Sequence, residues 1–241
     1  MTGAELGVIA LAVTLASCLQ SSIGFGLGLL AAPVIALVDP TLLPGTLVLL
    51  ATGVTVLGAL RERADIDFRG TGWALIGRLP GTALGALLVV ALPTRALALV
   101  LAVTVLVGVL LSVRGWRPAP TRGALVLAGA ASGVMGTATS IGGPPMALVW
   151  QDVSGARLRG TMSAFFLVGS VASLIVLVVL VAVGAIDGRT LRAAGVLVPA
   201  MLLGYVLSRF ANRHLDVRRL RGVALVASTL GALLVVVDQL S

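Results

Sequence analysis

Lysine is absent from the sequence, cysteine and histidine occur once each, and only 11% of the 241 residues are charged. A soluble domain carries about 25% charged residues, so this chain cannot cover a water-facing surface, and a cytosolic enzyme is excluded. The single cysteine, Cys18, cannot form an intrachain disulfide, which excludes a secreted disulfide scaffold. A hydrophobic share of 59% excludes a disordered tail. The composition therefore predicts a polytopic membrane protein.

The positive charge is carried by arginine alone, with 17 arginines against nine acidic residues and a net charge of +8. Such an excess is also typical of nucleic-acid binding. Here, however, the arginines form short clusters between long apolar runs, as expected for topology signals and lipid headgroup contacts. We therefore expect a lipid bilayer and no nucleic acid among the partners. A cleavable signal peptide is not expected either, because the first arginine is Arg61.

Apolar segments fill most of the chain. A single helical crossing needs about 20 residues, and most of the segments have about this length. The first and fifth are too long for one crossing, and each is interrupted by small and polar residues, at 20–26 and at 137–145. We predict a broken helix at each interruption, with its tip at membrane depth. The eight segments are 5–38, 42–60, 72–92, 95–113, 123–150, 160–184, 191–207 and 222–237.

The two halves of the chain resemble each other. Residues 21–24 (SSIG) match 139–142 (TSIG), and Gly45-Thr46 matches Gly160-Thr161. Three further pairs keep the same order, at 66–67 and 186–187, at 80–85 and 199–204, and at 92–95 and 215–218. An internal repeat explains these matches best. We expect a first transmembrane repeat at 1–116 and a second at 117–241, together forming one membrane domain, with a linker near 114–122.

The arginines discriminate between two topologies. If both long segments crossed the membrane once, the 16 loop arginines would divide eight to eight. If both turn back, 13 lie on one side and only Arg95, Arg189 and Arg192 on the other. The second arrangement agrees with the positive-inside rule, which places the 13 in the cytoplasm and both termini outside. The predicted fold is an all-α integral membrane protein with two inverted repeats, each a broken helical hairpin plus three transmembrane helices.

Inverted repeats with broken helices are typical of secondary transporters, whose substrates bind near the midplane. A broken helix frees backbone N–H groups, and a helix N-terminus attracts anions. Close helix packing is the alternative role for these glycines and hydroxyls. Gln20 and Gln151 flank the breaks and either bind substrate or tie the tip backbone. The candidate substrate-binding residues are Ser21, Ser22, Gly24, Gly26, Thr139, Ser140, Gly142, Gly143 and Arg78. The helix-break residues are Gln20, Pro33, Pro144, Pro145 and Gln151.

Arg78 is the one charge placed well inside an apolar segment. An ionisable residue at membrane depth is a functional-site candidate, and a cation suits an anion pathway. Alternatively, Arg78 extends to the cytoplasmic headgroups, because it lies only about six residues into its segment. Its counterpart in the second half is Leu197, so the charge is not duplicated.

At these residues the sequence resembles the TauE/SafE sulfite exporter family of bacterial membrane proteins. The resemblance covers nearly the whole chain. It lies in residues 24–28 (GFGLG) followed by Pro33, and in residues 140–145 (SIGGPP) of the second half. Leu27, Leu29 and Leu30 depart from the small residues expected there. The resemblance implies movement of small sulfur-containing or organic anions, such as sulfite or sulfonates, across the cytoplasmic membrane.

We therefore expect a secondary anion transporter that works by alternating access and exports its substrate under the membrane potential, with no cofactor and no metal. The alternative is a non-transporting membrane protein, either an assembly partner or an intramembrane enzyme. An enzyme would need a metal cluster, a Ser/His or Ser/Lys pair, or two membrane carboxylates. One histidine and no lysine leave little for such a site. A small anion is the expected partner, and a homodimer is left open.

Overall fold

The computed structural model describes residues 2–93, 118–180 and 187–214, together with isolated positions between 95 and 110 and between 226 and 237. All regular structure in these ranges is helical. The predicted segments 95–113 and 222–237 lie more than half outside the described residues, and so do residues 114–117 of the linker near 114–122. The helices are α1 (Gly3–Ile23), α2 (Leu27–Val38), η1 (Pro40–Leu42), α3 (Gly45–Arg61), η2 (Arg63–Asp65), α4 (Phe68–Ala91), α6 (Arg122–Thr139), α7 (Gly143–Val149), α8 (Gly155–Leu180) and α9 (Gly188–His214).

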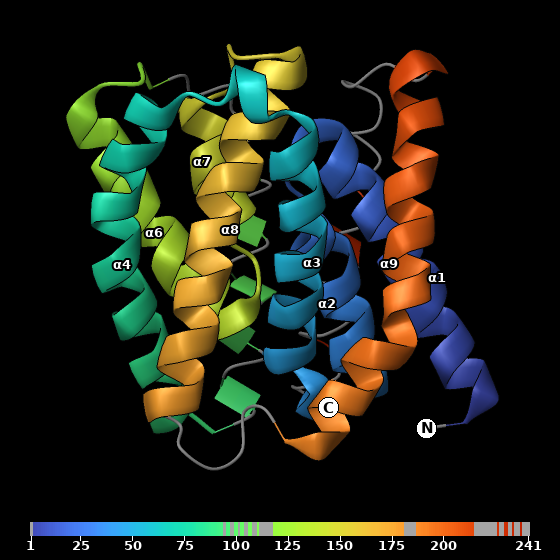
Figure 1. The fold of residues 1–241 in the computed structure, drawn as a ribbon. Coiled ribbons are helices and arrows are strands. Elements are labelled where there is room, and N and C mark those ends of the chain that lie inside the picture. The colour runs from blue at the N-terminus through green and yellow to red at the C-terminus, as the bar shows by residue number, and fades with distance from the viewer. Residues whose placement is uncertain are drawn as a thin grey trace.

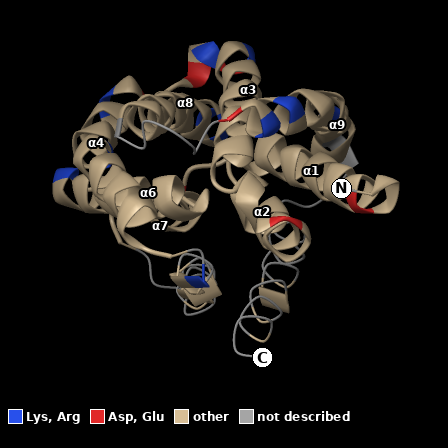
Figure 2. Ribbon diagram, turned by 90° about the horizontal axis from the view of Figure 1, so that it is seen from below, with Lys and Arg blue, Asp and Glu red and all other residues tan. Residues whose placement is uncertain are grey.

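Four of these helices, α1, α4, α8 and α9, are long and apolar enough to cross a membrane, and α2 and α3 are shorter apolar helices. Large apolar side chains on the outside of the bundle, such as Leu87, Val179 and Phe210, are more than half exposed. Figure 2 shows that charged positions are few and that most of the ribbon is uncharged. The chain is thus an all-α integral membrane protein with several crossings, as the composition predicts.

The first break follows Ile23, within the predicted interval. Gly24 adopts a left-handed conformation (φ 89°), and its N–H donates to the carbonyl of Gln20 at 2.7 Å, which closes α1. Gly26 has φ 134° and precedes α2. A side chain is strained at such angles, so glycine makes this sharp turn possible. Pro33, expected as a helix-break residue, instead lies inside α2.

The second break follows Thr139. Ser140 ends α6 in the left-handed region (φ 62°), and α7 begins at Gly143 with Pro144 and Pro145 in its first turn. Proline suits that position because its missing N–H would have no helical partner there. Both prolines therefore have the role predicted for them. Gln151 lies beyond the break, in the turn between α7 and α8.

Contacts at the two ends of the bundle show that the first broken helix turns back. Arg61, at the end of α3, donates to the carbonyl of Ser21 near the end of α1 at 3.0 Å. Asp39, just after α2, pairs with Arg189 at the start of α9, at the opposite end of the bundle. The chain thus returns along α2 to the end where α1 began. In the second half, α6 leads away from the end that holds η2, and α7 returns toward it (Figure 1).

Helices of one half pack against helices of the other. The helices α4 and α6 run parallel and in close contact through glycines spaced four residues apart. A Cβ added at Gly77 would lie 1.9 Å from the carbonyl oxygen of Val126, and one at Gly129 would lie 1.9 Å from that of Ala74. The helices α1 and α9 also run parallel, with the Thr14 hydroxyl donating to the carbonyl of Ala200 at 3.2 Å. Such small-residue contacts are typical of helix pairs in membranes.

Candidate functional site

A cavity of about 50 Å³ lies where the two breaks meet. The first break contributes Gln20 and residues 25–29, and the second contributes residues 140–143. Neighbouring helices complete the wall with Leu47, Val48 and Ala51 of α3, Arg78 of α4, Gly136 of α6, and Phe166, Ser170 and Ser173 of α8. Both halves of the chain therefore enclose one cavity.

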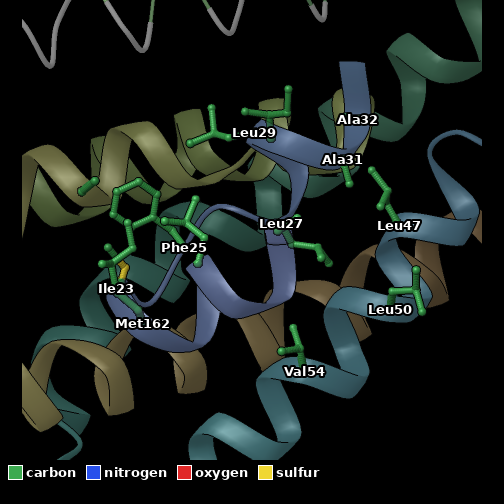
Figure 3. Packing of buried hydrophobic residues seen from close by; sticks show 14 of the residues in the cluster. Ile23, Phe25, Leu27, Leu29, Ala31, Ala32, Leu47, Leu50, Val54 and Met162 are labelled. Atoms are coloured by element: carbon green, nitrogen blue, oxygen red, sulfur yellow. The ribbon is translucent and has the colours of Figure 1, made fainter. Parts of the chain in front are cut away.

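The two breaks touch each other directly. A Cβ added at Gly28 would lie 1.9 Å from the carbonyl oxygen of Ser140, so only glycine fits at this crossing. On the other side of the crossing, the Phe25 ring packs against Gly143. Figure 3 shows the surroundings of the first break, where Phe25 and Leu27 lie between Met162 of α8 and the apolar side chains of α3. The breaks are thus held in a packed core.

Gln20 ties the first break together. Its Oε1 atom accepts a hydrogen bond of 3.0 Å from the backbone N–H of Leu27, the first residue of α2. The first N–H groups of a helix lack partners within the helix, and Gln20 satisfies one of them. Gln20 also lines the cavity. Its position is therefore compatible with both roles considered from the sequence, tying the backbone of the break and contacting a substrate.

Arg78 is the charged residue of the cavity wall. Its side chain is buried, with the residue only 3% exposed. The Nη1 atom donates to the Ser132 carbonyl at 3.1 Å and to the Ser132 hydroxyl at 2.6 Å. The guanidinium carbon lies 4.9 Å from the ring centre of Phe165 and 5.4 Å from that of Phe166. Arg78 therefore points into the protein, and the alternative in which it extends to the headgroups is wrong.

The guanidinium of Arg78 has no ion-pair partner among the described residues. Its Nε atom is buried and makes no hydrogen bond. Glycines on three sides make room for it, because a Cβ at Gly136, Gly142 or Gly169 would lie within about 3 Å of a guanidinium nitrogen. Burying a charge without a counterion costs a desolvation free energy on the order of several kcal/mol. The wall thus carries a positive charge that a bound anion would compensate.

The structure brings some of the sequence-predicted residues to the cavity and leaves others away from it. Those that line the cavity are Gly26, Arg78, Ser140, Gly142 and Gly143. The remaining candidates, Ser21, Ser22, Gly24 and Thr139, do not line it.

The four other candidates have local or structural contacts instead. The Thr139 hydroxyl donates to the carbonyl of Met135 in its own helix at 2.7 Å. Ser21 contributes its carbonyl to Arg61. A Cβ at Gly24 would meet Met162 at 2.8 Å, so Gly24 permits close packing against α8. Ser22 is buried at the end of α1. These positions therefore shape the break rather than the cavity wall.

Several cavity residues were not predicted from the sequence. Phe166, Ser170 and Ser173 follow one another at spacings of four and three residues, which places them on one face of α8. These are the two serines of the otherwise apolar run 164–183, and they could have indicated this face. Ser132, which holds Arg78, is a lone serine among small residues of α6, and no sequence pattern distinguishes it.

The hydroxyl residues of the wall already have hydrogen-bond partners. Ser140, Ser170 and Ser173 line the cavity beside Arg78, and the Ser140 hydroxyl donates to the carbonyl of Pro44 at 3.3 Å. The Ser173 hydroxyl is hydrogen-bonded to that of Thr137 at 2.7 Å, and the Ser170 hydroxyl donates to the carbonyl of Leu167 at 3.1 Å. Within the described ranges, no three His, Cys, Asp or Glu side chains are grouped to hold a metal ion. The guanidinium of Arg78 is therefore the charged group that the described wall presents.

Comparison with known families gives one match. A protein-family model described as "Sulfite exporter TauE/SafE" matches residues 9–235 of the chain. The matched region contains both breaks, Arg78 and all residues of the cavity wall. No curated protein and no solved structure matches the chain.

Proposed function

Because this chain belongs to the TauE/SafE sulfite exporter family, we propose that it is a secondary transporter that exports small anions across the cytoplasmic membrane by alternating access. Sulfite, sulfonates and related organic anions are the proposed substrates. Family membership supports a membrane transporter.

The observation that carries the proposal is the buried cation at the breaks. Arg78 lines the cavity and has no carboxylate partner among the described residues, and a charge in this position is stabilised when an anion binds. A guanidinium also matches the planar geometry of two oxygens of a carboxylate, sulfite or sulfonate group. The single charge of Arg78 therefore favours a substrate with one anionic head.

The cavity size supports a small substrate. A volume of about 50 Å³ compares with about 10–15 Å³ on the same measure for one water molecule. The cavity thus has room for roughly four waters, which is about the number of heavy atoms in sulfite. A larger sulfonate would require the breaks or α8 to move apart.

The pairing of helices supports an inverted repeat. The first described α-helix of each half packs parallel to the fourth described α-helix of the other half. The pairs are α1 with α9, and α6 with α4. The two pairs run in opposite directions, as inversion requires. In such a transporter the halves at 1–116 and 117–241 move against each other around a site at their interface. The cavity between the breaks has that position.

The arginines support an orientation and a driving force. Arg61, Arg159 and Arg157 lie at one end of the bundle, joined by Glu62 and Asp67, whereas Arg189 and Arg192 lie at the other. We assign the first end to the cytoplasm. A membrane potential of 100 mV then supplies about 2.3 kcal/mol for each negative charge moved outward. Because the membrane potential drives the anion outward, export needs no coupling ion.

Uptake by proteoliposomes tests the proposal. Purified protein should show saturable flux of labelled sulfite, methanesulfonate or acetate under an imposed potential. Ser170→Leu fills the cavity from within a regular helix, so it should reduce the flux at least about tenfold by steric exclusion. Ser170 is preferable to Ser140, because a leucine at φ 62° would also strain the backbone.

The matched control is Val171→Leu, at the next position of α8, where the side chain is 41% exposed on the outside of the bundle. This variant should transport as the wild type does. Folded wild-type protein that carries none of the three anions would contradict the proposal and favour the non-transporting alternative. Equal flux in Ser170→Leu and Val171→Leu would show that the cavity is not part of the transport pathway.

A further inference from the structure

Ser132 connects the buried cation to the second break. It lies in α6, is fully buried, and is not part of the cavity wall. Its hydroxyl and its carbonyl both accept hydrogen bonds from Nη1 of Arg78. The same hydroxyl donates to the carbonyl of Gly142 at 2.6 Å. A chain of two short hydrogen bonds therefore joins Arg78 of α4 to the backbone of the break.

The packing around this chain leaves little freedom. A Cβ at Gly142 would lie 2.9 Å from the Ser132 hydroxyl and 3.0 Å from Nη1 of Arg78. An arginine side chain has several rotatable bonds, and its freedom must be lost when it binds a ligand in one geometry. Ser132 fixes the guanidinium before any ligand arrives, so less freedom remains to be lost on binding.

The partner of Arg78 is also chemically suited to an anion site. A carboxylate in the position of Ser132 would hold the guanidinium equally well, but it would neutralise the charge and compete with the anion. A neutral hydroxyl accepts one N–H group and leaves the positive charge uncompensated. Arg78 is thus anchored and still able to attract a ligand.

We propose that Ser132 is the positioning residue of the anion site, acting through Arg78 to hold the guanidinium at the cavity wall and against the second break. The inference rests on the proposed function, because it requires that Arg78 binds an anion. Loss of the hydrogen bond between Ser132 and Arg78 should weaken anion binding. Substitution of Ser132 should have this effect only in a protein that retains the guanidinium of Arg78.

A double-mutant cycle tests this role. The dissociation constants of sulfite, methanesulfonate and acetate are measured by calorimetry on purified wild type, Ser132→Ala, Arg78→Lys and the double variant. Loss of a hydrogen bond to a charged group should raise the dissociation constant of Ser132→Ala about tenfold. In the Arg78→Lys background, where Nη1 is absent, the same substitution should change it less than about twofold. In transport assays, KM should rise while the maximal rate stays near the wild-type value.

Two further variants separate positioning from folding. Ser17→Ala is the matched control, because Ser17 is also fully buried and its hydroxyl has no partner. It should leave the dissociation constant unchanged. Ser132→Cys keeps the size of the side chain with a weaker hydrogen bond. It should weaken binding by a smaller factor and decides the question if Ser132→Ala does not fold.

Each outcome points one way. Wild-type binding that is unchanged in folded Ser132→Ala or Ser132→Cys would overturn the inference and leave the proposed function standing. An equal loss in the Arg78→Lys background would also overturn it, because Ser132 would then act independently of Arg78. A wild-type protein that binds none of the three anions would overturn the proposed function and this inference together.

Discussion

Arg78→Met is expected to reduce anion flux about 100-fold or more while leaving the protein at least as stable as the wild type. Truncating one partner of a buried, hydrogen-bonded charge pair typically costs 2–5 kcal/mol of binding, about 30- to 5,000-fold in affinity. Replacing buried ionic groups by apolar ones is often neutral or stabilising, by about 1–4 kcal/mol. Removing the guanidinium leaves few buried polar groups without a hydrogen-bond partner, because the Ser132 hydroxyl still donates to the carbonyl of Gly142. Flux and thermal unfolding measured on one preparation check both parts.

Ligand-induced stabilisation gives this prediction a second readout. An anion at 100 times its dissociation constant should stabilise the wild type by about 2.7 kcal/mol and should not shift the unfolding of Arg78→Met. Arg192→Met is the control, because Arg192 lies exposed near the start of α9, away from the cavity. A folded Arg78→Met protein with normal flux would show that the cation does not serve transport. A clearly destabilised variant would assign Arg78 a structural role instead.

Gly77→Leu is expected to prevent stable folding. The added Cβ would lie 1.9 Å from the carbonyl oxygen of Val126, and backbone of a packed helix cannot give way by that amount. Overpacking of this kind costs about 3 kcal/mol or more when the obstacle is rigid. The variant should therefore elute largely as aggregate in size-exclusion chromatography, with a lowered unfolding temperature for any folded fraction.

Gly72→Leu is the matched control in the same helix, because nothing lies within 4 Å of a Cβ at Gly72. It should fold and melt as the wild type does. Should Gly77→Leu give a monodisperse protein of unchanged melting temperature, α4 and α6 would be farther apart than described, and the position of Arg78 between them would need revision.

The breaks and their ends could be predicted from local chemistry. Glycine at left-handed angles and proline in a first helical turn depend only on neighbouring residues, so the interruption at 20–26 and the first-turn position of Pro144 and Pro145 could be predicted, whereas Gly24 was expected to bind substrate and instead closes α1. Pro33 was not placed correctly, because a helix tolerates proline where packing and neighbouring contacts compensate for the missing hydrogen bond. The membrane class followed from the composition, and most apolar runs have the length of one crossing because the thickness of the bilayer sets that length.

The cavity wall depends on contacts between distant segments, which no local pattern specifies. The match between residues 21–24 and 139–142 aligned two sequences, but it did not determine where Ser21 or Thr139 would point. The environment of Arg78 was undetermined for the same reason: its anchor lies 54 residues away in α6, and its aromatic neighbours are in α8. A uniform apolar composition hides which helix faces meet.

The exchange of helices between the halves has a consequence for biosynthesis. Helix α1 meets its partner α9 late, since Thr14 of α1 contacts Ala200, 186 residues later. At about 5–20 residues per second, translation separates the two by about 10–40 s. During that interval Thr14 already has a hydrogen-bond partner, because its hydroxyl also donates to the carbonyl of Ala10 in the same helix. In nascent α1 this hydroxyl can thus remain hydrogen-bonded within the lipid until α9 is inserted beside it.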